Sequence, residues 1–192
     1  MNRAYALTIV LAAVAGATAF AAAGSTWSAD PVHSSATFTA THLGISHVTG
    51  TIPLKSAEIV VPDGSNIPSS VRAALDPSGI DTHNGMRDGD LRSPHFFETS
   101  TYAEMTFAST KITPADPTHF TIAGNLTMHG QTHPMTLDAQ YLGRGPGMGK
   151  NEMRIAYSAK GTIDRSQWGM TYGNPVVSNT VDIEIDVEAV KL

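Results

Sequence analysis

Eight histidines are the side chains best suited to bind a metal or to transfer a proton in this chain. His129 and His133 are separated by three residues, and His42 and His47 by four. Such spacings gather ligands on one face of a helix, but these pairs flank expected turns between strands, and four strand residues span roughly 13 Å. No carboxylate completes a recognisable metal motif. The pattern favours structural or surface histidines, and we predict no metal site.

The densest charged group lies within residues 87–98. In an enzyme, Asp88 or Asp90 would act as a general base with His95 nearby. Alternatively, Arg87 and Asp88 hydrogen-bond a cap segment to the rim of the fold, where loop backbone needs partners. We favour this second interpretation.

The sequence also gives no indication of a nucleophilic serine. None of the serines considered stands in a motif for an activated nucleophile. These serines are Ser34, Ser93 and Ser166. A glycine-rich phosphate loop is also absent from the sequence. We therefore predict that the protein is not an enzyme and has no catalytic residue.

Length and composition predict one globular domain. The chain has 192 residues, 41% of them hydrophobic and 15% charged, with a formal net charge of −5. That length is enough to enclose a core or a cavity. The mild acidic balance argues against nucleic acid or an anionic lipid surface as partner, because both select clustered Lys and Arg. Cysteine is absent, which excludes disulfides and thiolate metal sites.

The first residues have the pattern of a secretory signal peptide. A positive charge at Arg3 precedes an apolar run, Ala4–Val14, and small residues suited to signal peptidase follow up to Ala23. The run is short for a membrane span, and no stop-transfer charges follow it. We therefore predict a cleaved signal at residues 1–23 and a single domain over residues 24–192.

Beyond this segment, apolar and polar residues alternate with the period of a β-strand. The clearest case is the C-terminal stretch 181–189, where apolar residues interleave with carboxylates, as a half-buried antiparallel strand requires. Weaker alternation over residues 71–80 is interrupted by Pro77. The remaining predicted strands lie at 33–43, 48–61, 103–107, 120–128, 135–141 and 153–163. A total of about eight predicts an all-β fold, an eight-stranded antiparallel barrel able to hold one ligand.

Turns and a cap are expected between these strands. Gly130 and Gln131 suit a tight hairpin with glycine first. Residues 143–149 have the composition of a longer, flexible loop. Residues 84–98 lack the strand period, and their apolar side chains can share one side of a short helix. We expect this segment to cap one end of the barrel.

Alternation identifies an inward face but leaves open whether the barrel is solid or hollow. The predicted inner faces mix bulky Phe, Met and Leu with Ala and Gly, and small residues leave volume. Few charges point inward, so a ligand would be a long apolar molecule. Each buried methylene contributes roughly 0.8 kcal/mol, and about a dozen carbons could therefore reach about micromolar affinity.

A series of short motifs resembles the YceI-like family. The series opens with Asp30–Ser34 and His42–Gly50. The remaining matches, in chain order, are Ile80–Thr82, Arg87-Asp88, Leu91–Phe97, Met105–Phe107, Gly124–Gly130 and Arg165–Met170. The resemblance covers essentially the whole chain after the signal segment.

This resemblance implies a lipocalin-like barrel in the periplasm that binds polyisoprenoids such as quinone tails, or other long amphiphiles. It implies no cofactor. It also implies a homodimer and, as in some members, a cytochrome b561-type membrane protein as partner, with a role near quinone traffic or stress.

The chain departs from the family pattern at three places. Asp90 stands where the family usually has His, the usual aromatic before Gly169 is Trp168, and residues 143–149 lack a Pro-Trp-Gly-like segment. These departures concern the contacts of a ligand head group more than the barrel.

Alternation and resemblance together predict the side chains that contact the ligand. Those predicted to line the tunnel are Phe38, Phe107, Leu126, Met128, Ile155, Tyr157 and Trp168. Those predicted to close one end are Met86, Leu91, Phe96 and Phe97. We therefore predict a binding or carrier protein for a long isoprenoid. The alternatives are a stress-response barrel that acts through a protein partner without a lipid, or a lipid-modifying hydrolase or isomerase.

Overall fold

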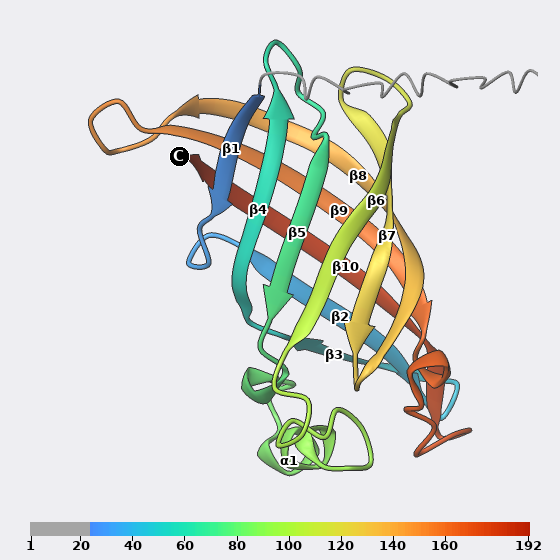
Figure 1. Ribbon diagram of the computed structural model, residues 1–192. Helices are drawn as coiled ribbons and strands as arrows, with labels where there is room; N and C mark the ends of the chain where they lie inside the picture. Colours follow the sequence, from blue (N-terminus) through green and yellow to red (C-terminus); the bar gives the residue numbers. More distant parts are fainter. Residues whose placement is uncertain (1–23) are drawn as a thin grey trace, which may run out of the picture.

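The computed structural model describes residues 24–192, which form an antiparallel β-barrel with one α-helix below one end (Figure 1). The strands are β1 (Gly24–Ala29), β2 (Ser35–His42), β3 (Ser46–Thr51), β4 (Leu54–Pro62), β5 (Ser70–Leu75), β6 (Met105–Pro114), β7 (His119–Met128), β8 (Gln131–Pro146), β9 (Met153–Asp164) and β10 (Val177–Lys191). The helical elements are η1 (Pro77–Gly79), α1 (Gly85–Arg92) and η2 (Arg165–Trp168). The predicted signal at residues 1–23 lies outside the described residues.

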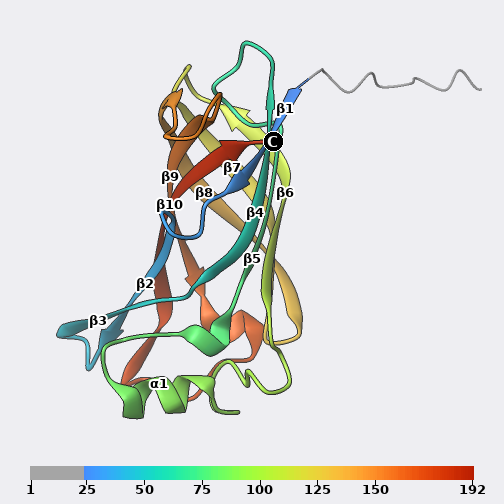
Figure 2. The same cartoon turned by 90° about the vertical axis from the view of Figure 1, so that its left-hand side faces the viewer.

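Among the described residues, eight strands close the ring. β4 to β10 pair consecutively, and β1 joins β10 to β4. The C-terminal part of β10 pairs with β1 and its N-terminal part with β2, which in turn pairs with β3. The β2–β3 hairpin bends away from the ring above α1 (Figure 2). The predicted eight-stranded antiparallel barrel is confirmed.

The C-terminal alternation places the two faces of β10 as predicted. Ile183 and Ile185 face the interior, whereas Asp182 and Glu184 are exposed on the outside. A strand with period 2 can satisfy both environments at once, because successive side chains point to opposite faces. The strand β10 is therefore specified by local sequence.

Two strand boundaries predicted from the sequence were wrong. The strand expected over residues 71–80 ends at Leu75, because Pro77 lacks an N–H and the Asp76 side chain caps η1 by accepting from Ser78 N. The strand expected over residues 48–61 divides into β3 and β4 on either side of Pro53.

Two turn predictions were also wrong. The β7–β8 hairpin turns at His129 and Gly130, both with positive φ (48° and 70°), so glycine comes second, as in a type I′ turn. β8 continues through Gly143 to Pro146 after a register shift between Tyr141 and Gly143. Less of this region is therefore loop than its glycine content predicts.

The predicted helical cap is confirmed as α1. The Asn84 side chain caps its first turn by accepting from Arg87 N. α1 and the segment that follows it lie across the end of the barrel from which the β2–β3 hairpin projects (Figures 1 and 2). No helix within residues 24–192 has the length and apolarity needed to cross a bilayer.

Candidate ligand-binding site

The barrel contains an apolar cavity of about 140 Å³. Aromatic and aliphatic side chains from strands all around the ring line it, and the described lining contains no charged side chain. Its larger side chains include Phe38, Ile59, Val71, Phe107, Phe120, Ile122, Leu126, Leu137, Tyr157, Ile183 and Ile185. Such a surface favours a hydrocarbon over a polar molecule, since burying an unpaired polar group is costly.

Two phenyl rings of this lining lie against glycines on neighbouring strands. The Phe107 ring on β6 covers Gly124 on β7, and the Phe38 ring on β2 covers Gly50 on β3. A Cβ at either glycine would clash with the ring. Glycine at these two positions lets the rings lie close to the wall, which leaves space in the interior.

One end of the barrel is closed by the β4–β5 loop. The Tyr157 hydroxyl donates to the Asn66 carbonyl (2.8 Å), and Arg144 Nη2 donates to the Ser65 carbonyl (2.8 Å). The Arg144 guanidinium also lies 5.4 Å from the centre of the buried Trp27 ring. Burial raises the pKa of Tyr157, so its hydroxyl remains a donor. We call this end the closed end.

At the opposite end, a second pocket of about 650 Å³ lies between the β2–β3 hairpin and the cap. Phe38, Ala40, His42 and Val48 line its hairpin side. The cap contributes Asn84, Met86, Arg87, Asp90, Leu91 and Phe96. We call this space the mouth pocket. Because Phe38 lines both spaces, the mouth pocket adjoins the interior cavity at this ring.

Hydrogen bonds to Thr82 fix the cap to the barrel rim. The buried Asp88 carboxylate accepts from Thr82 N (2.9 Å) and Oγ1, and Arg87 donates to the Thr82 carbonyl (2.8 Å). The bonds from Thr82 lower the pKa of Asp88, so the carboxylate stays ionised. Thr82 follows Asp81, which pairs with Thr51 at the end of β3. These contacts agree with the structural interpretation of Arg87 and Asp88.

Aromatic contacts hold the cap to the loop before β10. The buried Phe96 ring meets Tyr172 edge to face at 5.7 Å, and the Arg165 guanidinium lies 5.5 Å from its centre. His95 stacks on Tyr172 at 4.0 Å, and its Nδ1 lies 2.8 Å from Asp90 Oδ1. His95 and Asp90 are exposed, so the cap is pinned by side chains that solvent can reach.

Comparison with known proteins agrees with this architecture. A family model described as a YceI-like domain matches residues 27–189. The chain belongs to the YceI-like family. Protein YceI of Escherichia coli O157:H7 is 31% identical over 161 residues, which cover 83% of this chain and 82% of that protein.

Solved structures carry the same fold. The YceI protein of Campylobacter jejuni is 27% identical, with a TM-score of 0.69 over 79% of this chain and 90% of that chain. A polyisoprenoid-binding domain from Saccharophagus degradans is 15% identical, with a TM-score of 0.58 over 86% of this chain and 98% of that chain. The second likeness shows the fold alone.

The YceI-like barrel brings part of the predicted site together. Phe38, Phe107, Leu126 and Tyr157 line the interior cavity. Met86, Leu91 and Phe96 line the mouth pocket, and Phe38 belongs to both. These seven side chains therefore surround two adjoining spaces rather than one uniform tunnel.

Four other predicted residues pack outside both linings. Ile155 is fully buried in the core, as are Met128 and Trp168 near the β7–β8 turn, and Phe97 packs against the core half-buried. The Trp168 indole N–H donates to the Leu126 carbonyl (3.1 Å), which holds the ring in place. Alternation predicts the inward face correctly but does not show where along a strand packing fills the interior.

Several cavity residues were not selected from the sequence. Phe120 and Ile122 share a face with Leu126 on β7, and Ile183, Ile185 and Val187 share one on β10. The same alternation that selected Leu126 marks them as inward-facing. Alternation therefore marked these residues as inward-facing, but no sequence feature showed which inward-facing side chains line a cavity and which fill the core.

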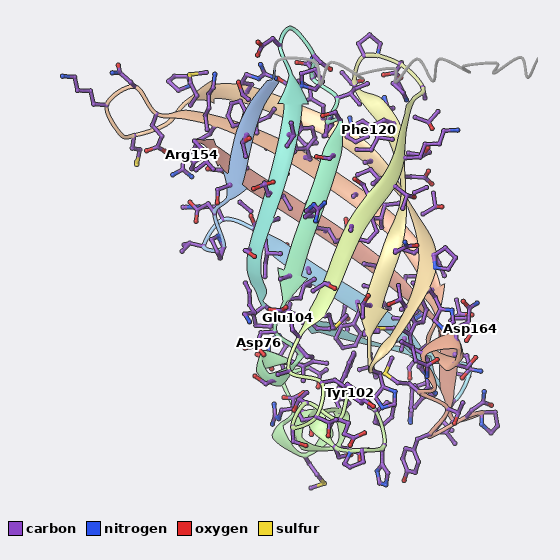
Figure 3. The ribbon with its side chains drawn as sticks, viewed as in Figure 1. Asp76, Tyr102, Glu104, Phe120, Arg154 and Asp164 are labelled. Carbon is purple, nitrogen blue, oxygen red and sulfur yellow. The ribbon has the colours of Figure 1, made fainter. Side chains whose placement is uncertain are left out.

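A cluster on the surface near the closed end has metal-ligand residue types. Asp30, His33 and Glu188 offer three ligand atoms within 4.8 Å of one another. Arg154, which lies at this end (Figure 3), donates to both carboxylates. Hydrogen bonds from His33 and then from Arg154 lower the pKa of Asp30 to about 2. The cluster is part of an ion-pair network in which one guanidinium bridges Asp30 and Glu188.

Proposed function

We propose that this protein binds a long apolar isoprenoid, such as a polyprenyl or quinone tail, or a similar amphiphile inside the barrel. The observation that carries the proposal is the uncharged interior cavity, which adjoins the mouth pocket at Phe38. An isoprenoid offers only hydrocarbon to such a wall. Its affinity would come from burial, at roughly 0.8 kcal/mol per methylene.

The two volumes indicate how a long ligand would be arranged. A cavity near 140 Å³ has the size of engineered cavities that hold benzene, whereas 650 Å³ lies within the usual range for ligand pockets. The tail tip would therefore occupy the interior, and the rest of the chain would lie in the mouth pocket.

A polar end of the ligand would remain in the mouth pocket. Asn84, Arg87, Asp90 and His42 contribute the polar and charged atoms of its lining, in contrast with the interior. The amphiphile would then enter with its apolar end first. The similarity of this chain to a polyisoprenoid-binding domain supports the same ligand class.

Binding without catalysis is part of this proposal. Family membership and fold favour a binding protein. Asp88 is engaged by Thr82 within the cap, and His95 stacks on Tyr172 on the outside. The lipid would therefore leave the protein chemically unchanged, as expected of a carrier.

The cellular setting is also proposed. The pattern of residues 1–23 and the family resemblance support a periplasmic location, which fractionation of the cells would test. The resemblance alone supports a homodimer, a cytochrome b561-type membrane partner and a role near quinone traffic or stress.

Filling the interior tests the proposal. Ala139 lines the cavity and is buried, so Ala139→Phe should occupy space that the ligand needs. Ala123 lies on the opposite face of β7, between inward Ile122 and Gly124, so Ala123→Phe is the matched control. Calorimetric titration with geranylgeraniol should show affinity reduced at least about tenfold in Ala139→Phe, because several methylenes lose their burial. Ala123→Phe should bind as the unmodified protein does.

Circular dichroism should first establish that both variants remain folded. Equal affinity in folded Ala139→Phe and in the unmodified protein would contradict binding inside the barrel. Loss of affinity in Ala123→Phe alone would place the ligand on the outer surface instead.

A further inference from the structure

Large apolar side chains are exposed around the mouth pocket. Leu43 and Ile45, at the tip of the β2–β3 hairpin, are 57% and 86% exposed. Met86 on α1 is 88% exposed, and Tyr172 and Val176, in the loop before β10, are 51% and 44% exposed. We call these five side chains the apolar rim. They come from three segments that are far apart in the sequence.

The three segments adjoin one another and the pocket. Leu43 N donates to the Val176 carbonyl (2.7 Å), which joins the hairpin tip to the loop before β10. His95 stacks on Tyr172, which joins that loop to the cap. Met86 itself lines the mouth pocket. The hairpin and α1 project from the same end of the barrel (Figure 2), so the apolar rim borders the opening on several sides.

Charge is excluded from two of these segments. The sequence has no Asp, Glu, Lys or Arg between Asp30 and Lys55, and none between Arg165 and Asp182. In a protein of net charge −5, this leaves the hairpin and the loop before β10 without the carboxylates that cover other surfaces. Neutral apolar loops are suited to the interface of a bilayer, where exposed Leu, Ile and Tyr side chains can be buried.

Exposed apolar residues elsewhere lie beside charges. Met148, which is fully exposed, is followed by Lys150 and Glu152. Leu142 precedes Arg144, and Leu192 follows Lys191. Single exposed apolar residues of this kind are ordinary. In the apolar rim, Met86 also lies beside charges, Arg87 and Asp88, but the hairpin and the loop before β10 form an uncharged apolar set at the pocket opening. Such a set is typical of a docking surface.

We propose that the apolar rim docks the protein on the zwitterionic interface of a lipid bilayer, with the mouth pocket facing the membrane. The purpose of docking rests on the proposed function: a lipid ligand could pass between the bilayer and the barrel without crossing water. Attachment itself requires no ligand. Since the rim lacks clustered Lys and Arg, anionic lipid should not strengthen it.

Vesicle flotation tests this docking. Vesicles of phosphatidylcholine alone would be mixed with the unmodified protein, Ile45→Asp and the control Met148→Asp. Ile45 and Met148 are 86% and 101% exposed, so neither change removes packing in the fold. The unmodified protein and Met148→Asp should float with the vesicles, and Ile45→Asp should partition about ten- to hundred-fold more weakly. Adding phosphatidylglycerol should not increase binding.

Geranylgeraniol titration in the absence of vesicles separates this proposal from the proposed function. Unmodified protein that binds geranylgeraniol but not vesicles would overturn docking and leave ligand binding intact. Protein that floats with vesicles but does not bind geranylgeraniol would overturn the proposed function and leave docking intact. Equal flotation of Ile45→Asp and the unmodified protein, or equal losses in Ile45→Asp and Met148→Asp, would overturn the role of the rim.

Sedimentation velocity without vesicles tests whether the apolar rim instead binds a second copy of the protein. If the unmodified protein does not float, and Ile45→Asp converts a dimer to a monomer, the rim is an interface between copies and docking is overturned. A protein whose association state is unchanged by Ile45→Asp, but whose flotation is lost, supports the membrane as occupant.

Discussion

The two ends of the barrel are built differently. At the closed end, Tyr157 and Arg144 bind the β4–β5 loop, and Trp27 is only 2% exposed. At the mouth end, a single short helix caps a pocket of about 650 Å³, and apolar side chains remain exposed. One end of the barrel is therefore closed by a loop, whereas the other keeps a pocket between the hairpin and the cap. Strand pairing holds the ring together along its length, and only the mouth end leaves a large pocket open for a ligand.

Strand lengths produce this asymmetry. β5 ends at Leu75, and β3 leaves the ring to pair with β2 alone apart from its bridge at Asp81. The mouth is therefore bordered by the β2–β3 hairpin and by the cap. Side-chain hydrogen bonds to Thr82 hold the cap to the end of the barrel. Tyr102, which follows the cap segment in the chain, lies at the end opposite Arg154 (Figure 3).

The largest effect on stability should come from the closed end. Trp27→Ala removes a fully buried indole and should lower the free energy of unfolding by about 3–5 kcal/mol. Met86→Ala at the mouth removes an exposed side chain and should change it by less than about 0.5 kcal/mol. Urea denaturation followed by circular dichroism measures both. Similar losses in the two variants would contradict the division between the ends.

A smaller and local effect is expected from the cap. Asp88→Ala leaves the Thr82 N–H without its acceptor and Arg87 without the neighbouring charge. Amide hydrogen exchange in α1 should become roughly tenfold faster, while exchange in β9 and β10 stays unchanged. Mass spectrometry of exchanged peptides gives both rates. Faster exchange throughout the barrel would show that the cap and ring unfold together.

The smallest effect should be present at neutral pH and disappear in acid. The pKa of Asp30 is lowered from 3.8 to about 2 by its hydrogen bonds from His33 and Arg154. A carboxyl with a lowered folded pKa contributes stability above pH 3.8, and this contribution is lost as the pH falls through about 2. Asp30→Asn should therefore melt lower than the unmodified protein at neutral pH, and the two should converge toward pH 2. Melting curves that stay equally far apart at every pH would contradict this role.

The fold follows from local sequence wherever one strand face is apolar and the other polar, as in β10. β1 carried no such signal, because Gly24–Ala29 combines small and polar residues around Trp27. It forms a strand through its pairing with β4 and β10, which a local pattern cannot reveal. Tertiary pairing therefore supplied the closure of the ring.

The candidate site was predictable to a similar degree. Alternation placed Phe107 and Leu126 on the inner face, where they line the cavity, but it also selected Met128, which fills the core. The family resemblance added Trp168, which likewise fills the core. The division into a small interior and a larger mouth pocket depends on where the strands end. The apolar rim depends on contacts between distant segments, so no local pattern could identify it.

Native mass spectrometry of the protein purified from the cells that produce it, followed by extraction of any bound lipid, tests the central claim most directly. We expect a stoichiometric polyprenyl or quinone species, or a similar long amphiphile, that is recovered chemically intact. An empty protein that also fails to take up added geranylgeraniol or quinone would contradict lipid binding and would favour a barrel that acts through a protein partner.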